Sequence, residues 1–192
     1  MVHLQLIIGS TRPTRFADKP AAWIADRLGA REDLTFETVD LRDYPLPLFD
    51  AARSPMHTGR DYATEALGAW GRKLDEADGY IFLVAEYNHS FTAVLKNALD
   101  VVYPELNRKP AAFVGYGGVG GARAVEQLRL VAVELEMAPL RHAVHILPPV
   151  LIPAVQSTAI DVELFAALDP RLDVLATDLV WWASALKAAR AG

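Results

Sequence analysis

The chain has 192 residues, of which 52% are hydrophobic and 22% charged, and its formal net charge is −5. This composition is typical of a globular protein, the acidic balance without a lysine or arginine run argues against a nucleic-acid partner, and the lack of cysteine excludes disulfides and thiol chemistry. No stretch is long and apolar enough for a membrane span and no signal-peptide pattern opens the chain, so we expect one cytoplasmic domain over residues 1–192 without a membrane partner.

A short apolar strand at residues 4–8 is followed by a polar loop. A helical pattern then begins at Phe16, so backbone N–H groups and a helix N-terminus face the loop. The loop is neither a Walker A motif nor a dinucleotide fingerprint, which favours the single phosphate of a mononucleotide. The alternative is an ordinary strand-to-helix connection with solvated arginines. The candidate phosphate donors are hydroxyl and guanidinium groups from Ser10, Thr11, Arg12, Thr14 and Arg15.

Strands and helices then alternate along the chain. The apolar patterns predict further strands at residues 34–39, 80–84, 111–114 and 141–147, and helices at 16–28, 58–77, 93–103, 122–136, 162–168 and 172–190. Residues 43–50 and 148–158 contain several prolines, so we expect both segments to be irregular. This alternation predicts an α/β three-layer sandwich around a five-stranded parallel sheet, with the flavodoxin-like strand order 2-1-3-4-5.

In a sheet of this kind, ligands bind outside the carboxyl ends of the strands. The loop after the third strand carries Glu86, Tyr87, Asn88, His89 and Ser90. An aromatic ring and an amide next to each other suit a planar heterocycle with imide-type edges. A serine nucleophile is poorly supported, because no G-x-S-x-G sequence occurs. A helix-capping turn without a ligand is the other alternative.

The loop after the fourth strand, residues 115–120, matches G-x-G-x-x-G. It follows the wrong strand for a dinucleotide site, and no acidic residue ends the next strand. Missing side chains at Gly117 and Gly118 instead allow a flat ring to lie against the backbone; a tight packing turn is the alternative. His142 and His145 point to opposite faces of a strand, so we expect no metal site there.

These residues resemble the NADPH-dependent FMN reductase family, which has a flavodoxin-like fold and includes quinone, azo-dye and chromate reductases. The resemblance covers nearly the whole chain, and its most specific part is Glu86-Tyr87-Asn88 with the downstream Lys-Asn-Ala of residues 96–98. It implies that Ser10, Arg12 and Arg15 hold the FMN phosphate. It further implies that Glu86, Tyr87 and Asn88 line the isoalloxazine and that Gly117 and Gly118 contact its pyrimidine side. One departure is Ala85, where the family has proline; this loosens the loop backbone.

The resemblance implies an oxidoreductase with FMN as cofactor and NADPH or NADH as co-substrate. We expect ping-pong hydride transfer through the flavin to a small-molecule acceptor such as a quinone or free flavin, with no catalytic acid or base from the protein. A flavin-binding electron carrier or redox sensor is the alternative. Members of the family are commonly dimers or tetramers, so we expect a homodimer or homotetramer.

Overall fold

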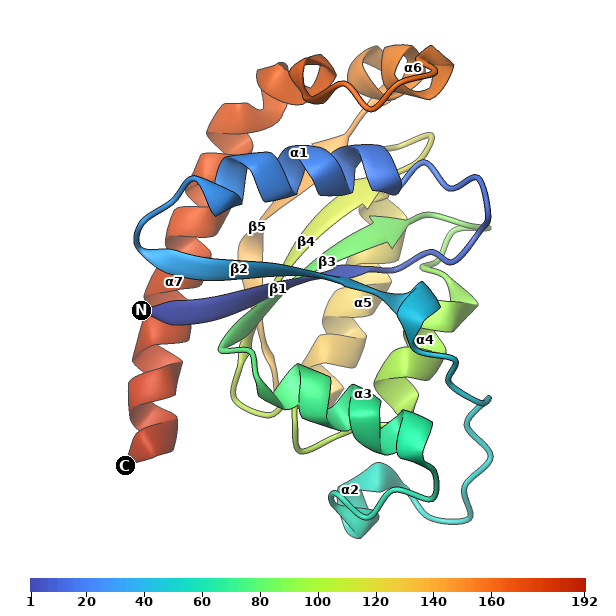
Figure 1. The fold of residues 1–192 in the computed structure, drawn as a ribbon, viewed down its shortest axis with the longest axis vertical. Helices are drawn as coiled ribbons and strands as arrows, with labels where there is room; N and C mark the ends of the chain where they lie inside the picture. The colour runs from blue at the N-terminus through green and yellow to red at the C-terminus, as the bar shows by residue number, and fades with distance from the viewer.

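The computed structural model covers residues 1–192 and forms a five-stranded parallel sheet between two layers of helices (Figure 1). The strand order is β2-β1-β3-β4-β5, which confirms the predicted flavodoxin-like arrangement. The strands are β1 (Val2–Ile8), β2 (Leu34–Asp40), β3 (Gly79–Ala85), β4 (Pro110–Tyr116) and β5 (Ala138–Ile146).

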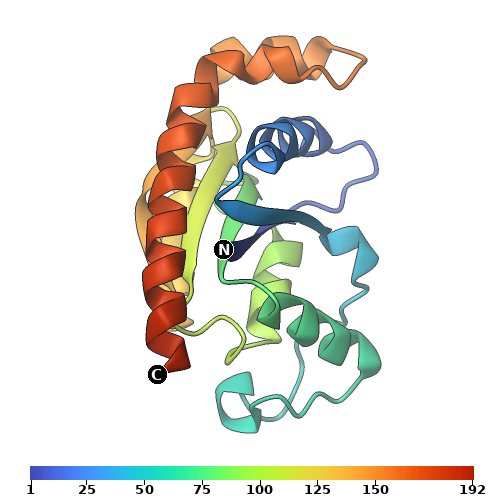
Figure 2. The same cartoon turned by 60° about the vertical axis from the view of Figure 1, so that its left-hand side comes forward.

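Helices cover both faces of the sheet (Figures 1 and 2). One face is covered by α1 (Asp18–Gly29) and α7 (Asp169–Ala191), and the other by α3 (Glu65–Asp75), α4 (Ala93–Asp100) and α5 (Ala122–Glu134). The shorter elements are η1 (Leu41–Asp43), α2 (Pro55–Thr58), α6 (Pro148–Gln156) and η2 (Val162–Leu168).

The sheet separates two hydrophobic clusters, of 27 and 23 buried residues. Alternate residues of a strand point to opposite faces, so Leu6 joins the cluster under α1 and α7 while Ile7 joins the cluster under α3, α4 and α5. β3 and β4 are buried along their whole length, as expected for central parallel strands. Because both faces of the sheet are packed against a hydrophobic cluster, the carboxyl ends of β1, β3 and β4 are held in place at one edge of the sheet.

The prediction that residues 148–158 are irregular is wrong, because Pro148–Gln156 form α6. Pro148 and Pro149 stand in its first turn, where a helix leaves N–H groups unpaired and proline is tolerated. The Lys19 ammonium donates to the carbonyl oxygens of Ala154 (2.6 Å) and Ser157 (2.5 Å), which ties the end of α6 to α1. A tertiary contact of this kind has no signature in local sequence.

The helix predicted over residues 58–77 is shorter in the structure, where only α3 (Glu65–Asp75) forms within that range. α3 begins only after Thr64, whose hydroxyl accepts a hydrogen bond from the Leu67 N–H, while α2 ends at Thr58. Gly59, with a φ of 62°, is placed between the two helices and ends the first of them.

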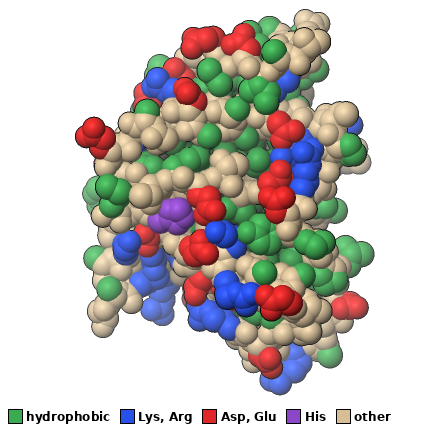
Figure 3. Space-filling model, in the orientation of Figure 1, with side chains coloured by type: hydrophobic (Ala, Val, Ile, Leu, Met, Phe, Trp, Pro, Cys, Tyr) green, Lys and Arg blue, Asp and Glu red, His purple; other side chains and the backbone are tan.

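None of the helices is both long and apolar enough to cross a membrane. On the face shown in Figure 3, acidic and basic side chains lie beside one another. This agrees with the many ion pairs on the surface, such as Lys96 with Asp100 on α4 and Arg27 with Asp173 between α1 and α7.

Candidate functional site

The loops after β1, β3 and β4 meet at the carboxyl edge of the sheet. The Gly9 N–H donates to the Leu83 carbonyl (3.0 Å), and the Glu86 N–H donates to the Tyr116 carbonyl (3.0 Å). The buried hydroxyl of Thr92, at the N-terminus of α4, donates to the Gly9 carbonyl. These bonds join the three loops, so the predicted convergence is confirmed.

Ser10 and Arg12 in the β1 loop both contact Tyr87 in the β3 loop. The hydroxyls of Ser10 and Tyr87 are 3.0 Å apart, and Ser10 is 1% exposed. The Arg12 guanidinium lies 5.7 Å from the centroid of the Tyr87 ring and is exposed to solvent. It makes no ion pair, so its charge is available to an anion at this position.

The Arg15 side chain, which the resemblance assigns to the FMN phosphate, is paired with groups of the protein itself. Its side chain is buried and donates to Asp40 (2.7 and 2.5 Å), to Asp18 (2.6 Å) and to the Ser10 carbonyl (2.6 Å). Burial acts to lower the pKa of Arg15, but the hydrogen bonds to Asp40 and Asp18 raise it above its ordinary value. The guanidinium is therefore engaged within the protein, where it holds the loop that carries Ser10.

Tyr87 and Ser90 form a tight turn. Their backbones exchange two hydrogen bonds, with N–H to O distances of 2.8 and 3.1 Å. The two central residues, Asn88 and His89, have φ values of 51° and 70° and are exposed. Positive φ at both central positions is the mark of a type I′ turn, and Asn and His tolerate it better than most residues do. The turn presents the Asn88 side chain to solvent.

Glu86 faces α5 and is only 4% exposed in its side chain. One carboxylate oxygen accepts from Arg123 Nε (2.6 Å) and the other from the Arg123 backbone N–H (3.2 Å). Glu86 therefore occupies the N-terminus of α5, as an acidic cap does. Its carboxylate is engaged there by the protein itself, as the Arg15 guanidinium is in the β1 loop.

The backbone of the β4 loop approaches Glu86 closely. Gly117 has a φ of 151°, and a Cβ built on it would lie 3.0 Å from the Glu86 Cβ. Gly118 has open space around it and is exposed. Gly117 is required for the packing of two loops, and Gly118 leaves the backbone accessible.

Tyr116 has a buried hydroxyl without a hydrogen-bond partner in the protein. It lies near Ser10 and Tyr87, and burial raises the pKa of its phenol above the ordinary value. An unpaired buried hydroxyl is costly unless a ligand or water satisfies it. Together with the exposed guanidinium of Arg12, it gives this edge polar groups without protein partners, which fits a phosphorylated heterocycle such as FMN.

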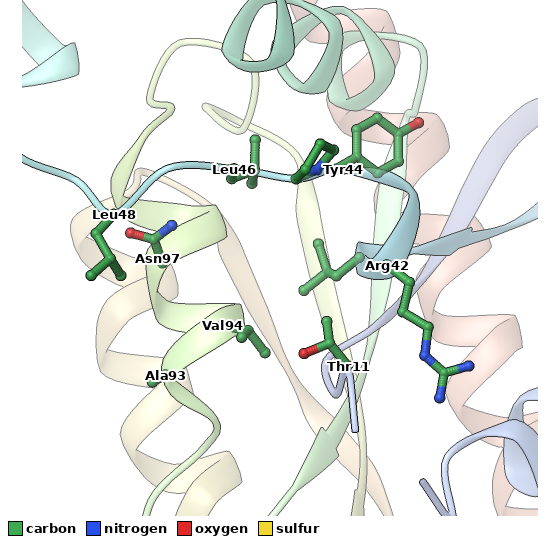
Figure 4. Close-up of a pocket in the computed structure, with 10 residues that line it drawn as sticks. Thr11, Arg42, Tyr44, Leu46, Leu48, Ala93, Val94 and Asn97 are labelled. Carbon is green, nitrogen blue, oxygen red and sulfur yellow. The ribbon is translucent and has the colours of Figure 1, made fainter. Parts of the chain in front are cut away.

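A cavity of ≈ 410 Å³ lies beside the loop after β1 (Figure 4). Thr11 lines it from the β1 loop, and Ala93, Val94 and Asn97 line it from α4. The opposite wall is η1 and the loop that follows it, with Leu41, Arg42, Tyr44, Pro45, Leu46 and Leu48. Of the predicted site residues only Thr11 lines this cavity.

A parallel sheet in this order, with a hydroxyl- and arginine-bearing loop after β1 and a Tyr-Asn turn after β3, defines the class of flavodoxin-like flavoproteins. Within that class, the model of the NADPH-dependent FMN reductase family matches residues 2–148, and the chain belongs to this family. It is therefore an oxidoreductase with FMN as its cofactor and NADPH or NADH as its co-substrate.

Two relatives illustrate the similarity. The chain is 41% identical over 133 residues to an NAD(P)H-dependent FMN reductase of Schizosaccharomyces pombe, which is 69% of this chain and 66% of the relative. It is 33% identical over 147 residues to an NADPH:quinone oxidoreductase of Arabidopsis thaliana, covering 71% of this chain and 69% of the relative.

Among solved structures, a flavoenzyme NAD(P)H:(acceptor) oxidoreductase from Paracoccus denitrificans shares the fold with a TM-score of 0.68. The alignment covers 96% of this chain and 98% of that one at 20% identity.

Several residues at this edge have no place in the prediction from sequence. Arg123 and Gln127 reach the β3 loop from α5, while Asn97, which belongs to the Lys-Asn-Ala motif of residues 96–98, bonds to the loop after β2, a contact that the motif did not indicate. For Arg123 and Gln127 the only signal is a polar residue on an otherwise amphipathic helix, which most often faces solvent. Tyr116 lies within the glycine-rich residues 115–120, but its unpaired hydroxyl is visible only in three dimensions.

Proposed function

We propose that the protein, as one FMN-binding domain, reduces small-molecule acceptors such as quinones or free flavin at the edge formed by Ser10, Tyr87 and Gly117. Bound FMN supplies the redox chemistry, since it accepts a hydride from NAD(P)H and passes two electrons to a second substrate. The observation that carries the assignment of the site is the contact of the β1 and β3 loops, in which Arg12 lies over the ring of Tyr87.

The residues of the edge divide into those that contact FMN and those that support the loops. Arg12, Ser10 and Thr11 hold the phosphate, because they offer a free guanidinium and hydroxyls next to the N-terminus of α1. Tyr87, Asn88, Gly117 and Gly118 line the isoalloxazine. We assign Arg15 and Glu86 to support, because both of their charges are already paired inside the protein.

The experiment is steady-state NADPH oxidation with a benzoquinone as acceptor, varied in both substrates. Ping-pong transfer predicts parallel lines in double-reciprocal plots, since the co-substrate product leaves before the acceptor binds. An electron carrier, the alternative class, is not reduced directly by NADPH and gives no turnover without a separate reductase. Absence of turnover by FMN-loaded protein therefore contradicts the assignment of a small-molecule acceptor.

We also propose that the protein is a homodimer or homotetramer of the cytoplasm, where NADPH and NADH are supplied. Support comes from large apolar side chains left uncovered on helices: Leu130 and Val133 on α5 are 73% and 60% exposed, and Trp181 on α7 is 65% exposed. Apolar groups of this size in a row on a helix are typical of an interface. Light scattering after gel filtration distinguishes one, two and four copies.

A further inference from the structure

Two side chains of α5 form hydrogen bonds with the turn after β3. Arg123 donates through its guanidinium to His89 Nε2 (2.8 Å) as well as to Glu86. One turn further along α5, the Gln127 amide donates to the His89 carbonyl (2.7 Å) and accepts from the Ser90 hydroxyl (2.6 Å). Because a guanidinium only donates, His89 Nε2 is the acceptor in its bond.

The spacing of Arg123 and Gln127 puts both on one side of α5. The turn that they reach contains Asn88 and His89, both in a left-handed backbone conformation that a residue with a side chain rarely adopts. A residue in this conformation is strained, so the conformation persists only where the surroundings hold it. The hydrogen bonds from α5 to His89 and Ser90 hold the turn in this conformation.

We propose that Arg123 and Gln127 are positioning residues, which fix the turn so that Tyr87 and Asn88 are ready for the isoalloxazine. Neither residue is placed against FMN; both act through the backbone and side chain of His89 and through Glu86 and Ser90. The proposal rests on the proposed function in one respect, namely that Tyr87 and Asn88 line the flavin ring. It adds a prediction for a region outside the family motifs.

Because Gln127 is exposed, its effect on the turn can be distinguished from an effect on the stability of the folded protein. Gln127 is exposed and its amide contacts only the turn, so its loss removes no core packing. The neighbouring Glu126 is equally exposed on the same helix and makes no hydrogen bond or ion pair. Glu126→Met is therefore a matched control for Gln127→Met.

The test measures FMN and riboflavin dissociation constants together with hydrogen exchange of the Tyr87 and Ser90 amides in the FMN-free protein. Gln127→Met removes two hydrogen bonds at an exposed turn. We therefore expect it to raise the dissociation constants of both flavins about three- to ten-fold and to speed the exchange of both amides by a similar factor. Glu126→Met leaves both quantities at the wild-type level. An equal factor for both flavins is the signature of the ring-lining turn, since a phosphate contact affects FMN alone.

Arg123→Lys is the second variant, because it keeps the charge beside Glu86 but is unable to reach His89 at the same time. We expect the same pattern with a larger factor and an altered visible spectrum of the bound flavin. Wild-type flavin affinity and wild-type amide exchange in Gln127→Met overturn the proposal, whatever Arg123→Lys does. If the wild-type protein binds no flavin, the proposed function fails, and the amide exchange still decides whether α5 holds the turn.

Discussion

Arg15 and Asp40 form a two-pronged ion pair in which the guanidinium nitrogens lie 2.7 and 2.5 Å from the two carboxylate oxygens. Asp40 is the last residue of β2, and Arg15 stands in the loop after β1. The pair therefore joins the loop after β1 to the end of β2, and the additional bond from Arg15 to the Ser10 carbonyl fixes the start of that loop. Arg12, three residues earlier, carries the arginine charge that stays free.

The two arginines should therefore respond differently to substitution. Arg12→Met removes an exposed charge, so it should weaken FMN about ten-fold or more while leaving riboflavin binding and the unfolding free energy nearly unchanged. Arg15→Met leaves Asp40 without its partner and should lower the unfolding free energy by about 3 kcal/mol, at the low end for buried pairs because Asp40 keeps some contact with water. Titration with both flavins and urea unfolding of the FMN-free variants measure these quantities. If only Arg15→Met weakened FMN binding relative to riboflavin binding, the roles of the two arginines would be reversed.

Asp40 should make stability depend on acid pH. Burial acts to raise the pKa of its carboxyl, but hydrogen bonds from Arg15 and from the Arg42 N–H outweigh burial and hold the pKa below its ordinary value. A lowered pKa in the folded state gives stability that is present above the unfolded-state pKa and is lost as the pH falls through the folded-state value. Asp40→Asn should therefore be less stable than wild type at neutral pH by about 1–3 kcal/mol, with the difference shrinking below about pH 4. Urea unfolding from neutral to acid pH measures the difference; a constant difference contradicts the pairing.

Lys109 should make the free energy of unfolding depend on pH in the alkaline range. Burial lowers the pKa of its ammonium to about 8, although the ammonium donates to the carbonyls of Leu74 (3.0 Å) and Asp75 (3.2 Å). The unfolded chain keeps a proton on this lysine up to its ordinary pKa, so folding becomes more favourable as the pH rises from about 8 to about 10.5. In that interval the unfolding free energy of the wild type should rise, relative to that of Lys109→Met, by up to about 1.4 kcal/mol per pH unit. Parallel pH profiles of the two unfolding free energies would show that Lys109 titrates normally.

Asn97 should hold the wall of the cavity in place. Its amide donates to the Pro47 carbonyl (2.8 Å) and its oxygen accepts from the Phe49 N–H (2.8 Å). The loop that it holds has no regular structure and leads to the exposed Arg53. Asn97→Leu removes both bonds, so limited trypsin cleavage after Arg53 should be about ten-fold faster in the FMN-free variant. Glu126→Leu, on the exposed face of α5 and without a hydrogen bond or ion pair, is the control and should leave the cleavage rate unchanged.

The strand order was predictable because buried parallel strands are continuous apolar runs, and right-handed crossovers leave few arrangements of five of them. The convergence of the loops followed from that order. The partners of charged side chains were not predictable in this way. Arg12 and Arg15 look equivalent in the sequence, yet Asp40, distant in the chain, takes one of them into an ion pair. In the same way, Lys19 stabilises a proline-rich helix that no local pattern indicated.

Ala85, where the resemblance implies a proline, is followed by a loop that neighbouring elements hold. It is fully buried at the end of β3, and the N–H of the next residue, Glu86, donates to the Tyr116 carbonyl. The loop is thus held by its neighbours on both sides, from β4 and from α5, without the proline. The looser loop backbone expected from alanine stays a prediction.

The proposed reaction is tested most directly by an anaerobic visible spectrum of the FMN-loaded protein, recorded before NADPH, after NADPH and after a quinone. We expect a yellow protein with one FMN per chain, whose flavin band disappears with NADPH and returns with the quinone. A protein that takes up no FMN, or whose bound FMN keeps its band when NADPH is added, contradicts the proposed reaction.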